Sequence, residues 1–177
     1  MWEVAMHRWF FGFVVLACAT VWGAEPSAAQ QWFYSQDDSA FGTGGKYIAV
    51  TANGMGYGFG LRCIGSGPEV LYTTTDQSLD REQVTQFNTL FSPSILVRVD
   101  NGEVMRIKGQ FVLIDTGLAV LADAPDDLAP QIRDAKRRIS VAIEAIDIMH
   151  ESKFGVRGST KAISQWMADC GSGNSIR

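Results

Sequence analysis

A segment in which glycine alternates with large side chains, residues 54–63, constrains the fold of this chain more than any other feature. Successive side chains of a β-strand point to opposite faces, and the two sets here are Met55, Tyr57, Phe59, Leu61 and Cys63 against Gly54, Gly56, Gly58, Gly60 and Arg62. We therefore predict one strand whose apolar face, ending in Cys63, belongs to a core. The glycine face is almost bare backbone, which favours close packing inside the protein over a ligand or peptide site.

The first 29 residues are predicted to be a secretory signal peptide. A weakly basic start at residues 6–8 precedes an apolar run over residues 9–23, and small residues up to Ala29 form the cleavage site. The run is shorter than the roughly 20 residues that span a bilayer, so no integral membrane span is expected after cleavage. An alternative is a lipoprotein signal at residues 15–18, with Cys18 lipidated.

Export determines what the cysteines do. Cleavage after Ala29 removes Cys18 and leaves an even pair, Cys63 and Cys170. The periplasm and the outside of the cell are oxidising, so we expect this pair to form a disulfide. Two buried free thiols are the alternative.

Length and charge limit the domain count and the partners. Residues 30–177 are long enough for one domain with a modest core and too short for two ordinary ones. The whole chain carries 15 basic and 19 acidic residues, a net charge of −4. Nucleic acid is therefore not an expected partner, because binding to a phosphate backbone needs a basic surface.

Several further strands are predicted. Residues 30–46 suit a strand and a turn, and short alternating or β-branched segments follow at residues 47–52, 70–74, 95–99, 105–107 and 118–121. The pair Asn101 and Gly102 between two of them indicates a two-residue hairpin turn.

Helical spacing appears in two places. Residues 79–91 are compatible with a short helix or an ordered loop. A last helix is predicted to begin at Gly158 or Ser159 and to end at Gly171, with Cys170 on its buried face.

Residues 126–150 fit two different structures. The isoleucines at positions 132, 139, 143 and 146 fit one long helix, but Ile139, Val141 and Ile143 also alternate as in a strand, so periodicity leaves residues 137–149 open. Arg133 and the cations at 136–138 are typical of the last turn of a helix that begins near Asp126, which favours a helix followed by a strand. These cations would suit an acidic partner, although a solvated helix end is the preferred interpretation.

Residues 111–117 run from apolar side chains into Asp115, Thr116 and Gly117, the order in which aspartic proteases present their catalytic carboxylate. Such a protease needs two carboxylates that share one proton. This chain has one Asp-Thr-Gly, followed by Leu118 where a small residue is usual. A hairpin turn with a solvated Asp115 is therefore expected, and a dimeric retropepsin-like protease that uses Asp115 is the alternative.

Other chemistry has little support in the sequence. His150, the histidine left after processing, lies in a polar stretch without partners for a triad or a metal cluster. The segment "GTGGKY" (42–47) lacks the first glycine and the hydroxyl residue of a phosphate loop. We expect no catalytic, cofactor-binding or metal-binding residues, and no enzyme activity.

Four segments carry a resemblance. A strand ending in "LRC" (61–63), then "ILVRVDNGE" (95–103), "LAPQIRDAKRRISVAIEA" (128–145) and "FGVRGSTKAISQWMADC" (154–170), resembles small exported proteins of Gram-negative bacteria. The groups in question are the VasI family of type VI secretion accessory proteins and the invasion-associated locus B proteins. The resemblance implies a helix near 126–136, strands near 138–146 and 153–157, a closing helix, and a disulfide between the matching cysteines. It implies no catalytic residues.

The predicted fold is α+β: a single β-rich domain with a mainly antiparallel, sandwich-like sheet, two short helices and one disulfide. The predicted function is a non-catalytic periplasmic or secreted protein of a Gram-negative bacterium. It is expected to bind a protein or an envelope component, in a process related to secretion or host interaction. A structural lipoprotein anchored through Cys18 is the remaining alternative.

Overall fold

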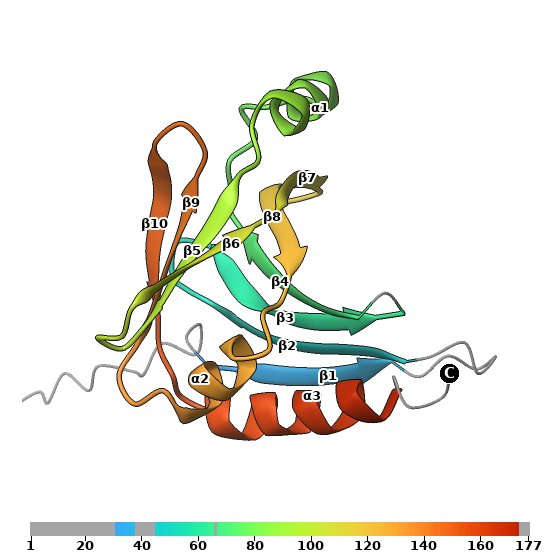
Figure 1. Cartoon of the computed structure of the whole chain (residues 1–177), viewed down its shortest axis with the longest axis vertical. Helices are drawn as coiled ribbons and strands as arrows, with labels where there is room; N and C mark the ends of the chain where they lie inside the picture. The colour runs from blue at the N-terminus through green and yellow to red at the C-terminus, as the bar shows by residue number, and fades with distance from the viewer. Residues whose placement is uncertain (1–30, 38–44, 66, 174–177) are drawn as a thin grey trace, which may run out of the picture.

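The computed structural model describes residues 31–37, 45–65 and 67–173 (Figure 1). The predicted signal peptide, Cys18 and residues 42–44 of the glycine-rich segment lie outside these ranges. The elements, in chain order, are β1 (Phe33–Asp37), β2 (Lys46–Ala52), β3 (Gly58–Ile64), β4 (Pro68–Thr73), α1 (Arg81–Leu90), β5 (Ser94–Val99), β6 (Val104–Lys108), β7 (Gln110–Ile114), β8 (Gly117–Asp123), α2 (Leu128–Asp134), β9 (Ile139–Glu144), β10 (Ile148–Phe154) and α3 (Ser159–Gly173).

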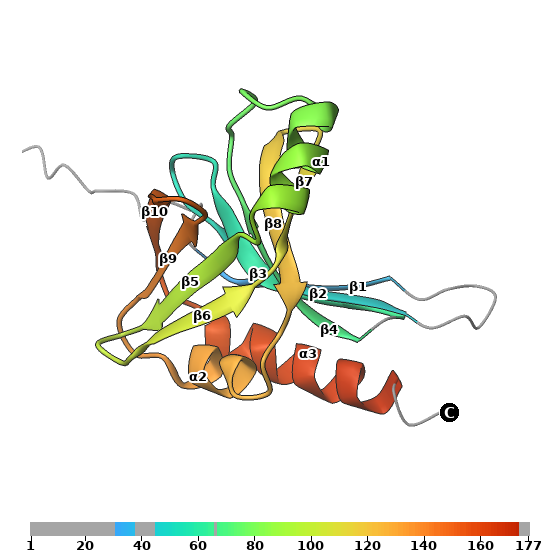
Figure 2. The ribbon, with the colours of Figure 1, turned by 45° about the horizontal axis from the view of Figure 1, so that its top comes forward.

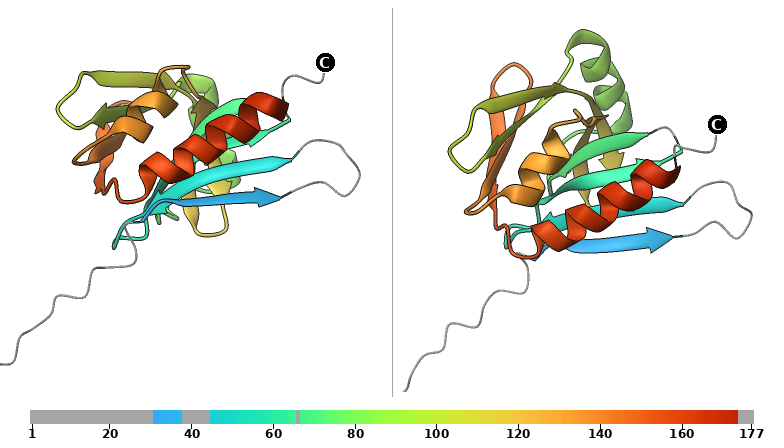
Figure 3. Two further views of the ribbon diagram at one scale, coloured as in Figure 1. Left: turned by 90° about the horizontal axis from the view of Figure 1, so that it is seen from below. Right: turned by 60° about the horizontal axis from the view of Figure 1, so that its bottom comes forward.

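Two antiparallel sheets pack around one core. One has the strand order β1-β2-β3-β4-β8-β7 and the other β10-β9-β5-β6. Helix α3 lies along β1 and β2, with α2 beside it (Figure 3). The predicted β-rich, antiparallel fold is confirmed, with one helix more than expected, since α1 forms where the sequence allowed a short helix or a loop.

The core joins the inner faces of both sheets. Phe59 of β3 packs against Trp32 and against Phe154 of β10, with ring centroids 6.1 and 5.8 Å apart. Ile95 and Ile143 of the smaller sheet are fully buried. Each such side chain contributes roughly 1.5–3 kcal/mol when it leaves water.

Strand β3 is shorter than predicted. It begins at Gly58, because residues 53–57 form a turn in which the Asn53 side-chain oxygen accepts hydrogen bonds from the backbone N–H of Met55 (3.0 Å) and Tyr57 (3.1 Å). Gly56 takes a φ of 79° in this turn. Met55 was expected on the core face and is instead 57% exposed.

The predicted disulfide is present. Cys63 and Cys170 are bonded, with their Cα atoms 5.8 Å apart and 107 residues between them in sequence. The bond joins α3 to the inner face of β3. The indole N–H of Trp166 donates to the backbone oxygen of Tyr47 (3.2 Å), so α3 is also attached to β2.

Residues 139–149 are two strands and a turn, so the long-helix interpretation is wrong. Helix α2 ends at Asp134, before the cations at 136–138, which were expected in its last turn. The Asp100 carboxylate accepts hydrogen bonds from the backbone N–H of Lys136 (2.8 Å), Arg137 (2.7 Å) and Arg138 (3.0 Å). These N–H groups lie beyond the end of α2, and Asp100 supplies the acceptors that helical carbonyls would supply if the helix continued. The next strand, β10, starts at Ile148 rather than near residue 153.

The β5–β6 turn is displaced by one residue from the predicted position. Gly102 donates its N–H to the Val99 oxygen (2.9 Å), which makes Asp100 and Asn101 the central residues in place of Asn101 and Gly102. Asp100 has a φ of 53°, a region that Asp tolerates better than most residues. Its carboxylate is thereby directed to the α2–β9 linker, which no local pattern indicates.

Asp100→Asn is expected to weaken the protein at neutral pH and to flatten its acid dependence. The three backbone N–H groups, that of Lys136 first, hold the pKa of Asp100 below its usual range. Its contribution to folding is therefore present above the ordinary carboxyl pKa and is lost as pH falls through the lower folded value. Urea unfolding at about pH 7 and about pH 2.5 measures this. Asp115→Asn, the same change at an exposed residue, is the control, and equal effects of the two substitutions would contradict the role of Asp100.

Helix α1 covers an edge of the larger sheet (Figure 2). It begins with a capping box, in which Asp80 accepts from Gln83 N–H and Gln83 accepts from Asp80 N–H, both at 2.8 Å. Its Asn88 side chain bonds both the oxygen (2.8 Å) and the N–H (2.7 Å) of Phe111 on β7. These bonds satisfy groups that an edge strand would otherwise leave open to pairing with another chain.

Helix α3 continues through Gly171 to Gly173, so the predicted end at Gly171 is wrong. A Cβ atom at Gly171 would meet nothing within 4 Å, and no neighbour forces the helix to stop there. Among the described residues, no helix is both long and apolar enough to cross a membrane.

Candidate functional site

Asp115 lies at a hairpin tip, as predicted. Ile114 and Gly117 are paired at the ends of β7 and β8, which leaves Asp115 and Thr116 as an exposed two-residue turn. The reason for the glycine differs from the expected one, because Gly117 lies at the start of β8 and not inside the turn. It has a φ of 151°, and a Cβ atom there would lie 2.3 Å from the Thr74 backbone oxygen.

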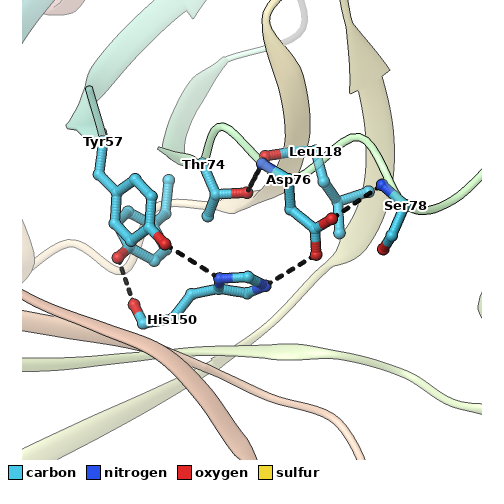
Figure 4. Close-up of polar contacts among 7 residues, drawn as sticks. Tyr57, Thr74, Asp76, Ser78, Leu118 and His150 are labelled. Carbon is cyan, nitrogen blue, oxygen red and sulfur yellow. Dashed lines mark hydrogen bonds and ion pairs between the residues drawn. The ribbon is translucent and has the colours of Figure 1, made fainter. Parts of the chain in front are cut away.

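A polar chain that the sequence did not indicate is centred on His150 (Figure 4). The Nε2 atom of His150 lies 3.2 Å from Asp76 Oδ2, and its Nδ1 atom lies 3.3 Å from the Tyr57 hydroxyl. The three residues come from the β4–α1 connection, from β10 and from the turn before β3. In the sequence, Asp76 lies 74 residues before His150 and Tyr57 lies 93 residues before it, and no motif connects the three.

The Asp76 carboxylate is held in place from its own loop. Ser78 N–H donates to Asp76 Oδ1 (2.8 Å), and Asp76 N–H donates to Thr74 Oγ1 (3.3 Å). The Thr74 hydroxyl in turn donates to the Leu118 oxygen (3.0 Å). The Ser78 hydrogen bond, with a smaller contribution from His150, holds the pKa of Asp76 below its usual range. Asp76 is therefore an anion that orients the imidazole at neutral pH.

Two buried contacts attach β10 beside this chain. The hydroxyl of Tyr72, a fully buried residue, donates to the His150 backbone oxygen, and burial raises the Tyr72 pKa. The Asn53 side chain donates to the buried Ser152 hydroxyl. Strand β10 has a bulge between Met149 and Ser152, and His150 takes a φ of 53° within it. The network therefore positions an irregular strand.

The Asp76 carboxylate, the His150 imidazole and the Tyr57 hydroxyl follow one another in the order of a proton relay. The hydroxyl is that of Tyr57, whose half-buried ring makes edge contacts with Tyr72 and His150 at 6.1 and 5.9 Å. The nearby cavity of about 460 Å³ is lined by residues of the 53–55 turn and by 151–153, and none of the three relay residues lines it. These contacts attach β10 to the β4–α1 connection and to the turn before β3.

The described residues contain no group of three or more His, Cys, Asp or Glu side chains that could hold a metal ion. In the His150 chain, Asp76 and His150 are the only side chains of that kind.

The larger sheet leaves one face open. Helix α3 and the smaller sheet both pack on its inner face, and no described helix or strand packs on the other (Figures 1 and 3). An apolar row crosses five paired strands on that outer face: Phe33, Val50, Gly60, Leu71 and Leu121. Phe33 is 57% exposed. A shallow groove of about 290 Å³ lies beside the row, over Gly58.

The glycine face of β3 belongs to this open surface, so the expected packing of another element on it is wrong for the described part of the chain. The neighbouring strand β2 fills the space above Gly60, since a Cβ atom there would lie 2.5 Å from Val50 Cγ1 and 2.4 Å from the Ala49 oxygen. Because Gly58 and Gly60 have no side chains, the surface of the sheet is lower at the centre of the apolar row, and the groove lies there.

The fold is similar to that of a solved protein. The crystal structure of invasion associated protein B from Bartonella henselae matches with a TM-score of 0.53 and 11% sequence identity, over 79% of this chain and 92% of that one. No protein-family model matches the chain, and no curated protein sequence does. The comparison supports a shared fold with one of the two groups that the sequence resembles, and nothing in the comparisons supports the VasI group.

Proposed function

We propose that this protein is an exported, non-catalytic binding protein of the bacterial cell envelope, and that it holds a protein partner on the open face of its larger sheet. The supporting observation is the apolar row from Phe33 to Leu121. The outer face of an antiparallel sheet is usually polar, and a contiguous apolar patch on a surface typically marks an interaction site.

Two other features support the setting. A disulfide persists in oxidising compartments, which suits the periplasm or the outside of the cell. The Bartonella protein of similar fold is described as invasion associated. By extension, we propose that the present chain has an accessory role in interaction with a host.

Photo-crosslinking tests the proposed surface. Benzoylphenylalanine is similar in shape to phenylalanine and can therefore replace the exposed Phe33. It is expected to form one discrete adduct in intact cells, because the proposed partner contacts this face. A second change, Leu71→Lys, puts a charge into the same row and is expected to reduce the adduct about tenfold, the effect of roughly 1.4 kcal/mol. The same probe at Ser164, exposed on α3, is the control. An adduct that is equally strong from Ser164, or insensitive to Leu71→Lys, would overturn the proposal.

Absence of catalysis is part of the proposal, and Asp115 provides its test. Because Asp115 is exposed at a tip, Asp115→Asn is expected to change the free energy of unfolding by about 1 kcal/mol or less. Neither the wild-type protein nor this variant is expected to show peptidase activity. The assay is peptide cleavage at acid pH by the purified protein, with and without pepstatin. Pepstatin-sensitive cleavage that disappears in Asp115→Asn would establish the dimeric protease instead.

The lipoprotein alternative depends on Cys18. We propose cleavage after Ala29, with residues 30–177 as the exported domain. The intact mass of the protein isolated from cells separates the two cases, because a chain that begins at a lipidated Cys18 is heavier by residues 18–29 and by the lipid.

A further inference from the structure

The outer face of the smaller sheet differs in charge from the rest of the protein. It carries five cations, Arg98, Arg106, Lys108, Arg138 and Lys153, and two acids, Glu144 and Glu151. The whole chain has 15 basic and 19 acidic residues, so this face has a net charge of +3 and the remaining 10 basic and 17 acidic residues have one of −7. The cations are therefore concentrated on one surface of an acidic protein.

Three of these cations surround one small residue. Ser140 on β9 is paired with Arg98 of β5 on one side and with Lys153 of β10 on the other. Neighbouring strands lie about 4.8 Å apart, so the Cα atoms of Arg98 and Lys153 are about 10 Å apart across Ser140. Arg138 directly precedes β9, two residues before Ser140 and about 7 Å from it. Three long cationic side chains can thus converge on one compact group above Ser140.

These cations are available to a ligand. The ion pairs of the described residues do not include Arg98, Arg138 or Lys153. Arg106, by contrast, is occupied by Glu144 at 2.5 Å. Glu151 also lines the groove and is the one acid there, against three cations.

The groove itself is partly apolar. It has a volume of about 360 Å³, and Leu96 and Ala142 lie in it beside the cations. Two exposed aliphatic side chains also line it, Val104 at 45% and Ile148 at 61% exposure. A ligand that fits must therefore carry a compact negative group and an apolar part.

We propose that this cationic groove binds the phosphate headgroup of an anionic lipid, with the phosphate above Ser140 and the adjoining apolar part of the lipid against Val104 and Ile148. One phosphate group is compact enough to contact three cations at once, whereas the carboxylates of an extended acidic peptide are spaced along its backbone. The protein would thus lie on a membrane surface through the smaller sheet, and the open face of the larger sheet would remain available to a protein partner.

Vesicle sedimentation tests this proposal. The purified protein is expected to bind phosphatidylcholine vesicles that contain about one third phosphatidylglycerol, and to bind pure phosphatidylcholine far more weakly. Arg98→Ala combined with Lys153→Ala is expected to weaken binding about 10- to 30-fold, because each cation near an anionic surface contributes a several-fold factor. Lys136→Ala combined with Lys161→Ala removes the same charge from exposed positions outside the groove and is expected to change binding little.

A second pair of variants tests the apolar contact. Ile148→Ser is expected to weaken vesicle binding several-fold, and Ile146→Ser, at the nearby exposed turn, is not. Both residues are more than half exposed, so both variants are expected to keep the fold, which circular dichroism verifies. Three outcomes would each overturn the proposal: equal losses in the Arg98/Lys153 and Lys136/Lys161 double variants, no preference for anionic vesicles, or tighter binding of soluble glycerol phosphate or polyglutamate than of vesicles.

Discussion

Replacing Cys63 and Cys170 together with alanine is expected to lower the free energy of unfolding by about 4 kcal/mol. The disulfide closes a loop with a sequence separation of 107 residues. A cross-link of that span removes a large part of the freedom of the unfolded chain, on the order of 4–5 kcal/mol in the chain-entropy model. Domains of this size have a total stability of roughly 5–15 kcal/mol, so the variant should lose between about a quarter and four fifths of its stability. Urea unfolding followed by circular dichroism measures the change.

Reduction of the wild-type protein is the matched control for this variant. It breaks the same bond but keeps both sulfur atoms between α3 and β3, and it should shift the urea midpoint by a similar amount. Neither change removes Trp166 or Tyr47, so a difference between the two is expected to report mainly the loss of the two sulfur atoms. A reduced protein as stable as the oxidised one would show that the disulfide adds nothing to folding.

Gly117→Ala is expected to lower the free energy of unfolding by about 3 kcal/mol, a large effect for the addition of one methyl group. The new Cβ atom would lie 2.3 Å from the Thr74 oxygen, and the φ of 151° is unfavourable for alanine. Relief of the clash requires residues 74–76 to move away from β8. That movement would break the two hydrogen bonds that Thr74 donates to the Leu118 oxygen, at 2.8 and 3.0 Å.

Gly171→Ala is the same substitution in the opposite environment and serves as the control. Gly171 lies in helix α3, and nothing lies within 4 Å of an added Cβ atom. Alanine favours a helix over glycine by up to about 1 kcal/mol, so this variant should be slightly more stable than wild type. Thermal unfolding of the two variants side by side is the measurement. A loss of stability of the same size in both would show that the position of Gly117 beside Thr74 is unimportant.

The candidate site shows where sequence reasoning reaches its limit. The sequence predicts the hairpin tip at Asp115 correctly, because a turn between two apolar strands is a property of neighbouring residues. The residues around His150 indicate no partner for it, yet it contacts Asp76 and Tyr57. Those contacts arise only when β10 packs beside the β4–α1 connection, and nothing in the residues around His150 indicates it.

The outer faces of the two sheets also depend on contacts between segments that are distant in the sequence. Alternation showed that β3 has a glycine face and an apolar face, but not which face another element would cover. The apolar row exists only because β1, β2, β3, β4 and β8 pair in one register. Likewise, Arg98, Arg138 and Lys153 meet around Ser140 through the pairing of β5, β9 and β10.

The sequence by itself determined the β-rich class, most strands and the pairing of Cys63 with Cys170. Side-chain alternation is local, and the two cysteines that remain after the predicted signal cleavage have only each other as partners. The tertiary structure decided between helix and strand for residues 139–149, whose periodicity fits both. Asp100, more than 35 residues away, accepts hydrogen bonds from the backbone N–H groups of residues 136–138 after α2, and β5 pairs with β9. A segment with two local solutions takes the one whose backbone groups find partners, and those partners lie elsewhere in the chain.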